Sequence, residues 1–194
     1  MHRVLKRDSH SVGPVLFVCA ATALSLGCSG RSWCAEVPAT KAARDATPCA
    51  SSAYRQFDFW SGDWDVVDTD RPSAVIAHAR VELILNGCVL HEIYEAADGH
   101  KGESFTLYDI SRNTWHQTWV TDAGYLLTIE GNLRGQAMIL EGTDRLQDGK
   151  PRQVRGEWRL EGDRVHEVAS RSTDGGATWT QWFDLIFKAR ATAR

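Results

Sequence analysis

The stretch that decides the fold covers residues 102–121 and reads GESFTLYDISRNTWHQTWVT. Side chains of unlike character alternate through 102–110 and again through 114–121, as in β-strands whose two faces meet different surroundings. The intervening Ser-Arg-Asn at 111–113 favours a tight turn. The stretch therefore predicts a β-hairpin.

Comparable segments recur along most of the chain. Asn, Asp and Gly interrupt them about every dozen residues, as expected of consecutive hairpins. The ten expected strands cover residues 64–68, 75–85, 88–95, 102–110, 114–121, 125–130, 136–141, 154–160, 165–170 and 178–188. Short connections imply antiparallel neighbours, and closure removes exposed sheet edges. We expect an all-β, antiparallel up-and-down barrel of the calycin type, with a β-sandwich as the competing architecture.

Composition limits both the size of the fold and its partners. A chain of 194 residues that is 43% apolar can bury one core, so a single domain is expected. The chain has 22 Lys and Arg residues and 25 Asp and Glu residues, so it has no excess of positive charge. Binding to a phosphate backbone requires such an excess, which argues against a nucleic-acid partner. Eight tryptophans supply aromatic surface that must be buried or used.

Residues 1–35 have the layout of a secretory signal peptide. A basic start is followed by an apolar run over 15–26, which is too short to span a bilayer, and then by small residues. We therefore expect a periplasmic or secreted bacterial protein. A lipid anchor on Cys28 is an alternative, because residues 25–28 partly match a lipobox. Residues 36–50 predict a flexible lead-in, which leaves 51–190 as a single β-barrel domain.

Loss of the leader would leave two cysteines, Cys49 and Cys88, in a compartment that permits disulfides. Two interpretations stay open: the two cysteines pair, or both remain buried thiols. No Cys–His spacing typical of zinc occurs, and the histidines lack helical i, i+4 spacing, so no metal site is expected. The sequence indicates no cofactor. The alternative is a haem group bound by a single histidine that faces the barrel interior.

The segment FDFWSGDWD at residues 57–65 predicts how the barrel begins. Residues 51–59 favour a short helix with one aromatic side, after which a glycine leads into the first strand. In lipocalin-like barrels a G-x-W motif closes one end at this place. Gly62 would let the backbone approach closely, and the indole of Trp64 would fill the base of the barrel or serve as ordinary core.

Residues 172–179, STDGGATW, fit the S-x-D-x-G-x-T-W pattern of the Asp box found in sialidase propellers. A propeller repeats the motif once per blade, whereas this chain carries it once. We therefore expect a structural role for Ser172, Asp174, Gly176 and Trp179. The carboxylate would accept backbone N–H groups across the turn, and the indole would pack over the hairpin.

A larger set of motifs covers residues 54–188. It comprises F-D-F-W-x-G-x-W at 57–64, Gly87-Cys88 with Glu92, Gly102-x-Ser104 with Tyr108-Asp109, Trp115-x-Gln117-x-Trp119, and S-x-D-G-G-x-T-W at 172–179. By this set the chain resembles a family of exported bacterial proteins known as a domain of unknown function. The resemblance implies a lipocalin-like barrel and brings no established reaction. Where the family pattern leads us to expect Gln, before the Asp box, this chain has His166-Glu167.

Three neighbouring strands each carry one face of polar and aromatic side chains. These faces consist of Glu92 and Tyr94; Ser104, Thr106 and Tyr108; and Trp115, Gln117 and Trp119. If they point inward, they form an aromatic wall with a carboxylate, an amide and hydroxyl groups, which is typical of a site for a small apolar ligand. The competing interpretation is a filled core in which these polar groups satisfy one another.

Three functional hypotheses follow. The preferred one is an exported barrel that binds a small hydrophobic or aromatic molecule in its cavity. The second is an isomerase, cyclase or lyase with Glu92 as general acid or base and Tyr108 as a neighbouring donor, because aromatic enclosure would raise the pKa of the glutamate. The third is a non-catalytic scaffold that presents loops to another protein. The sequence leaves the ligand and the oligomeric state open.

Overall fold

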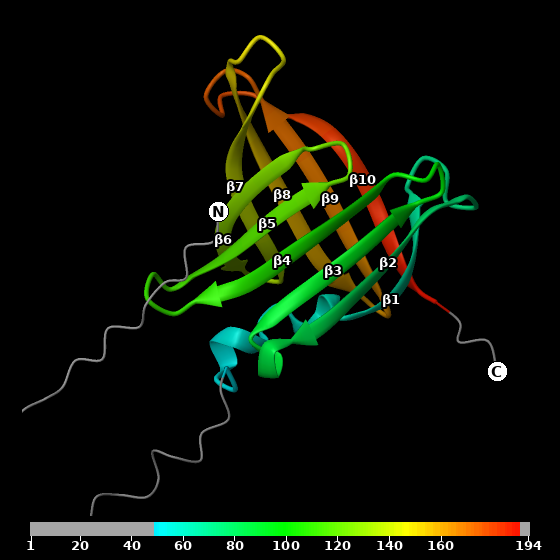
Figure 1. The fold of residues 1–194 in the computed structure, drawn as a ribbon, viewed down its shortest axis with the longest axis vertical. Helices are drawn as coiled ribbons and strands as arrows, with labels where there is room; N and C mark the ends of the chain where they lie inside the picture. Colours follow the sequence, from blue (N-terminus) through cyan, green and yellow to red (C-terminus); the bar gives the residue numbers. More distant parts are fainter. Residues whose placement is uncertain (1–48, 191–194) are drawn as a thin grey trace, which may run out of the picture. The chain divides into compact units, whose positions relative to one another are not determined.

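The structure is a computed structural model, and it describes residues 49–190. Ten strands form one closed antiparallel barrel in which each strand pairs with the next and β1 pairs with β10 (Figure 1). The strands are β1 (Gly62–Asp68), β2 (Val75–Ile84), β3 (Val89–Ala96), β4 (Lys101–Asp109), β5 (Thr114–Thr121), β6 (Leu126–Arg134), β7 (Ala137–Arg145), β8 (Pro151–Glu161), β9 (Arg164–Ser172) and β10 (Thr180–Ala189). The predicted up-and-down barrel is confirmed, and the sandwich alternative is wrong.

The expected signal peptide, Cys28 and all but the last two residues of the lead-in lie outside the described residues. Among the described residues there is no helix with the length and apolar character needed to cross a membrane.

Strands β6 and β7 are longer than the sequence pattern predicts, and glycine is the reason. Gly131 and Gly142 lie inside the strands, where glycine usually indicates an interruption. A Cβ atom at either position would lie about 2 Å from a backbone oxygen of the partner strand, at 2.0 Å for Gly131 and 2.1 Å for Gly142. These glycines therefore permit a close approach of the β6 and β7 backbones.

The end of the barrel where β1 begins, here called the closed end, is covered by two short 3₁₀ helices in place of the single helix expected over 51–59. They are η2 (Ser52–Arg55) and η3 (Asp58–Trp60), drawn in cyan in Figure 1. Aromatic residues recur every third position at 54, 57 and 60, and a helix with three residues per turn places them on one side. This side faces into the barrel.

The aromatic plug at the closed end centres on Phe57. Its ring stacks on Trp60 at 5.2 Å and meets Trp158 edge-on at 5.5 Å. Trp64 donates its indole N–H to the Trp60 carbonyl oxygen at 3.0 Å. Its ring lies over Gly62, where a Cβ atom would be 2.5 Å from the indole. Gly62 thus lets the indole of Trp64 lie close to the backbone, and Trp64 belongs to the buried core at this end of the barrel.

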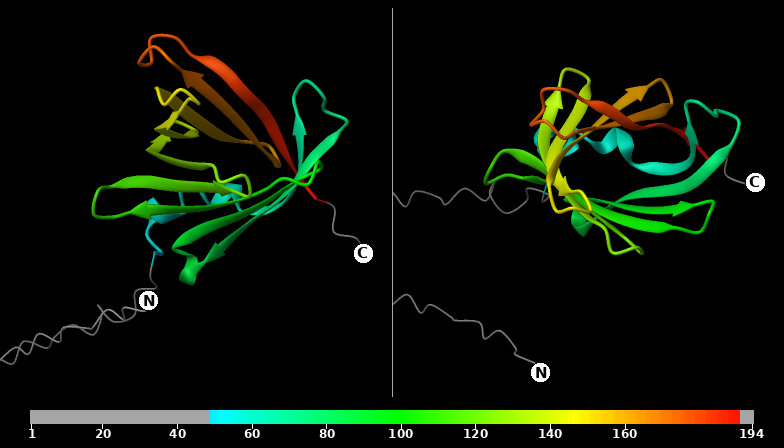
Figure 2. Two further views of the ribbon diagram at one scale, coloured as in Figure 1. Left: turned by 45° about the horizontal axis from the view of Figure 1, so that its top comes forward. Right: turned by 90° about the horizontal axis from the view of Figure 1, so that it is seen from above.

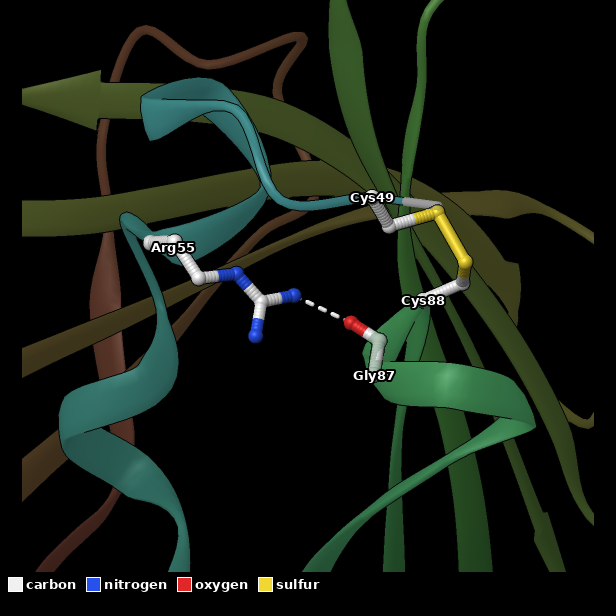
Figure 3. Close-up of a disulfide and its surroundings, with 4 residues drawn as sticks. All are labelled: Cys49, Arg55, Gly87 and Cys88. Atoms are coloured by element: carbon white, nitrogen blue, oxygen red, sulfur yellow. Dashed lines mark hydrogen bonds between the residues drawn. A yellow bond between two sulfur atoms is a disulfide. The ribbon is translucent and has the colours of Figure 1, made fainter. Parts of the chain in front are cut away.

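A disulfide joins Cys49 to Cys88, with their Cα atoms 5.1 Å apart (Figure 3). Of the two interpretations that the sequence leaves open, the structure has the paired cysteines. The bond attaches the start of the described chain to the β2–β3 connection, which contains η4 (Leu85–Gly87). Arg55 of η2 donates a hydrogen bond to the Gly87 carbonyl oxygen in the same connection. Both links hold the plug against the barrel wall.

The β9–β10 connection lies at the opposite, open end and contains the Asp box. The Asp174 carboxylate accepts hydrogen bonds from the Ser172 hydroxyl at 2.7 Å and from the Thr178 backbone N–H at 2.9 Å. The Gly176 N–H donates to the Ser172 hydroxyl oxygen, and the Trp179 indole donates to the Gly176 carbonyl oxygen. All these contacts are made within the turn, which agrees with a structural role.

Candidate functional site

A cavity of about 340 Å³ lies inside the barrel between the plug and the open end. Figure 2 shows the strands curving around a common interior, with the cyan 3₁₀ turns across one end. The aromatic side chains in its lining are Tyr94, Trp119, Trp158, Trp182, Phe183 and Phe187. The polar side chains are Asp68, Glu92, Gln117 and Glu167. The volume is within the range of small-molecule sites, about 300–1,000 Å³.

Two tryptophans leave room for this cavity because each packs closely against a glycine of the wall. A Cβ atom on Gly102 would lie 2.2 Å from the Trp119 ring, and one on Gly156 would lie 2.5 Å from the Trp158 ring. Any other residue at these positions would push the indole toward the lumen. The space at the centre of the barrel therefore depends on these two glycines.

Glu92 of β3 is an interior carboxylate, as the strand alternation predicts. Its side chain is 5% exposed and lines the cavity. The Ser104 hydroxyl of the paired strand β4 donates a hydrogen bond to it at 3.0 Å. Burial raises its pKa to about 7, and the Ser104 hydrogen bond opposes the rise. Near neutral pH this group is therefore present in both its protonated and its ionised form.

Glu167 of β9 is a second interior carboxylate, and sequence reasoning did not assign it to the site. It is 9% exposed and lines the cavity. Burial and the charge of Glu92 together raise its pKa well above the ordinary value, and Trp158 opposes this. The alternation of β9 could have identified it, because Glu167 lies two residues from Val165 and two from Ala169, which both face inward.

Two further predicted residues complete the polar part of the lining. Gln117 of β5 donates a hydrogen bond to the Thr106 hydroxyl at 3.0 Å. The Tyr94 ring meets Trp119 edge-on at 6.0 Å, and burial raises the pKa of the phenol. Thr106, like Ser104, is fully buried behind the lining and supports the group in front of it.

Trp115 and Tyr108 are not brought to the cavity. Trp115 is buried in the plug, where it meets Phe57 at 5.7 Å. The Tyr108 hydroxyl donates to Asn113 at 3.3 Å near the closed end. Glu92 is opposite Ser104 of β4. Tyr108 lies four residues further along the same strand, about 13 Å from Ser104. The structure therefore separates Tyr108 from Glu92, although both were expected at one site.

An ionic cluster lies between the cavity and the open end. Arg152 holds Asp144 with two hydrogen bonds, at 2.9 and 2.6 Å, and Tyr125 donates to the same carboxylate at 2.7 Å. Arg171 lies 3.5 Å from Asp144, and its guanidinium covers the Trp182 ring. The pKa of Asp144 is lowered by these hydrogen bonds and charges against the effect of burial. Both arginines are thus engaged by one carboxylate.

The histidines of the described residues do not line the cavity. Three histidines on the strands pair with acidic side chains: His91 with Glu103, His116 with Glu130, and His166 with Glu161 and Asp184. No group of three or more side chains suited to a metal ion occurs in residues 49–190.

The arrangement offers two kinds of chemistry. A cavity lined by aromatic side chains favours an apolar or aromatic body, and two carboxyl groups with raised pKa values add a proton donor and acceptor or a counter-charge. No protein-family model and no curated protein matches the chain.

Proposed function

We propose that the protein is an exported, lipocalin-like carrier that binds a small, mostly hydrophobic or aromatic molecule in its barrel. The observation that carries this proposal is the cavity of about 340 Å³ with six aromatic side chains in its lining. An interior that served stability alone would be filled, because unfilled space forfeits packing energy. The unfilled cavity also favours a binding role over a scaffold that only presents loops.

Two features support a carrier that works outside the cytoplasm. The Cys49–Cys88 disulfide suits an oxidising compartment, and residues 1–35 have the layout of a secretory signal. The plug closes one end, so a ligand would enter at the other, where Trp182 is 39% exposed and Phe183 lies beside it at 5.0 Å.

The test is native mass spectrometry of the protein purified from its own cell envelope, followed by titration of the delipidated protein with lipids and aromatic compounds. A bound ligand should quench the fluorescence of Trp119 and Trp158, because both line the cavity. The substitution Ala169→Phe should abolish binding, since Ala169 lines the cavity. Val168→Phe is the matched control, because Val168 is the neighbouring residue on the opposite face of β9.

Binding by Ala169→Phe that equals binding by Val168→Phe would place the ligand elsewhere. Failure of a broad panel to quench, together with a bare protein mass, would contradict the carrier proposal. Thermal unfolding of both variants shows whether a loss of binding reflects a loss of folding.

A second function, proton-transfer catalysis on the same ligand, is favoured by one specific observation. Glu92 has a pKa of about 7 and faces a cavity that also contains Glu167. Such a pair could move a proton in an isomerase, cyclase or lyase, with Glu167 in the place expected for Tyr108. Deuterium exchange into the bound ligand in D₂O that is lost in Glu92→Gln at a saturating ligand concentration would support catalysis. An unchanged exchange rate in Glu92→Gln would remove this residue from the mechanism.

A further inference from the structure

The charged side chains that line the cavity all have one sign. Asp68, Glu92 and Glu167 are in the lining, and within residues 49–190 no Lys, Arg or His joins them. The nearest arginines along β8 and β9, Arg152 and Arg171, lie one inward position beyond the lining and are held by Asp144. The cavity therefore holds acidic groups without a basic partner from the described chain.

The polar groups at the centre of the cavity are also under-satisfied. Glu92 accepts one side-chain hydrogen bond, from Ser104, and the one donor that bears on Glu167 is the indole of Trp158. The indole N–H of Trp158, which is opposite Glu167 across β8 and β9, has no acceptor in normal hydrogen-bond geometry, yet it lies near enough to lower the pKa of Glu167. A buried carboxylate in this situation must take up a proton or find a cation, because the uncompensated charge is costly.

The surrounding aromatic rings suit the second solution. Trp119 and Trp158 both line the cavity, and each packs closely against a glycine of the wall. Tyr94 stands beside them, edge-on to Trp119. Aromatic faces attract organic cations, and the attraction is strongest in a desolvated site. A metal ion would instead need a cluster of oxygen, nitrogen or sulfur ligands, and the described residues contain no such group of three.

We propose that the ligand of this barrel is an organic cation, a primary or quaternary ammonium on a short aromatic or aliphatic body, whose charge is held between Glu92 and Glu167. This inference rests on the proposed carrier function and names its ligand class. The ammonium lies between the two carboxyl groups, and its single positive charge offsets one of the two negative charges that they carry when both are ionised. The rings of Trp119 and Trp158 flank it, and the apolar body occupies the remaining space.

The proposal predicts a dependence of binding on pH. The groups that face the two glutamates or border their layer are Asp68 of β1, Tyr94 of β3, Ser104 of β4, Gln117 of β5, Trp158 of β8, and the cluster of Tyr125, Asp144, Arg152 and Arg171. Glu92, with its pKa of about 7, is the group that changes charge near neutral pH. An ammonium must displace a proton below that pH, so affinity should fall by up to about tenfold per pH unit as the pH decreases below 7.

The experiment is calorimetric titration of the delipidated full chain at pH 8 and pH 5.5 with four probes. Two are cations, 2-phenylethylamine and benzyltrimethylammonium, one is neutral, 2-phenylethanol, and one is an anion, 3-phenylpropionate. At pH 8 the cations should bind at least tenfold more tightly than the other two. Glu92→Gln and Glu167→Gln should each weaken cation binding at least tenfold and leave 2-phenylethanol unchanged. Glu103→Gln removes the same charge from the outer face and should change nothing.

Each contrary result has a distinct meaning. If 2-phenylethanol or 3-phenylpropionate binds as tightly as the cations, the inference is overturned and the carrier function stands. If the cations bind more tightly but the two interior Gln variants match wild type, the carboxylates do not hold the charge, and the inference is again overturned. If no probe binds, the inference is overturned, and the carrier function is decided separately by its own panel and by the mass of the native protein.

Discussion

Glu92→Gln should stabilise the protein at pH 8 and leave its stability unchanged at pH 4. Burial holds the pKa of Glu92 at about 7, against an ordinary value of 4.5. Below pH 4.5 the carboxyl group is protonated in both the folded and the unfolded chain. Between pH 4.5 and 7 only the unfolded chain ionises, so the free energy of unfolding falls as the pH rises. Above pH 7 the loss is complete.

The size of the effect follows from the two pKa values. Their difference corresponds to about 3 kcal/mol, and the residue is almost fully buried, so solvent screens little of it. Gln has the same shape and keeps an oxygen that can accept the Ser104 hydrogen bond. At pH 8 the variant should therefore exceed wild type by about 3 kcal/mol, a large share of typical domain stability.

The measurement is urea unfolding of wild type and Glu92→Gln at half-unit steps from pH 4 to pH 8.5. The two curves should coincide at the acid end and separate as the pH rises through 4.5 to 7. Glu103→Gln, on the exposed face of β4, serves as the control for a change in net charge. Parallel curves for wild type and Glu92→Gln would refute the reasoning, since they would show that the carboxyl group titrates alike in both states.

Three further outcomes test other parts of the structure. Replacement of Cys49 and Cys88 by Ser should lower the free energy of unfolding by about 4 kcal/mol, because the disulfide closes a loop of 39 residues and so reduces the entropy of the unfolded chain. In urea unfolding, reduced wild type should match the variant. Gly102→Ala should lower stability by about 1–3 kcal/mol and weaken ligand binding, because its Cβ would push Trp119 into the cavity; ligand affinity equal to wild type would count against this. Asp144→Asn should cost about 2 kcal/mol at pH 7, since it leaves two half-buried arginines without their anion, and unchanged thermal unfolding would contradict that role.

The order and direction of the strands could be predicted from the sequence, because alternation and turn residues are local signals. The predicted hairpin at 102–121 is present, and the structure places Ser104 opposite Trp119 and Thr106 opposite Gln117. The inward parity of Glu92 followed from the same alternation. The sequence was less informative at glycines, because a glycine can either end a strand or allow a close approach of two backbones within it. Gly131 lies inside β6 and does not end it.

Only the tertiary structure decided which inward residues share a site. The alternation along a strand predicts that a side chain faces the lumen. It does not predict how far from the closed end that side chain lies, which depends on which end the plug fills. Trp115 and Trp119 have the same parity, yet the first packs in the plug and the second lines the cavity.

Glu167 joined the site for the same non-local reason. It lies on β9, far from β3 in sequence, and the closure of β1 onto β10 brings both strands around one lumen. A local pattern can place each glutamate on an inward face, because a strand repeats every two residues. The electrostatic coupling of Glu167 to Glu92 arises only when the ten strands close, since it depends on distance across the barrel and not along the chain.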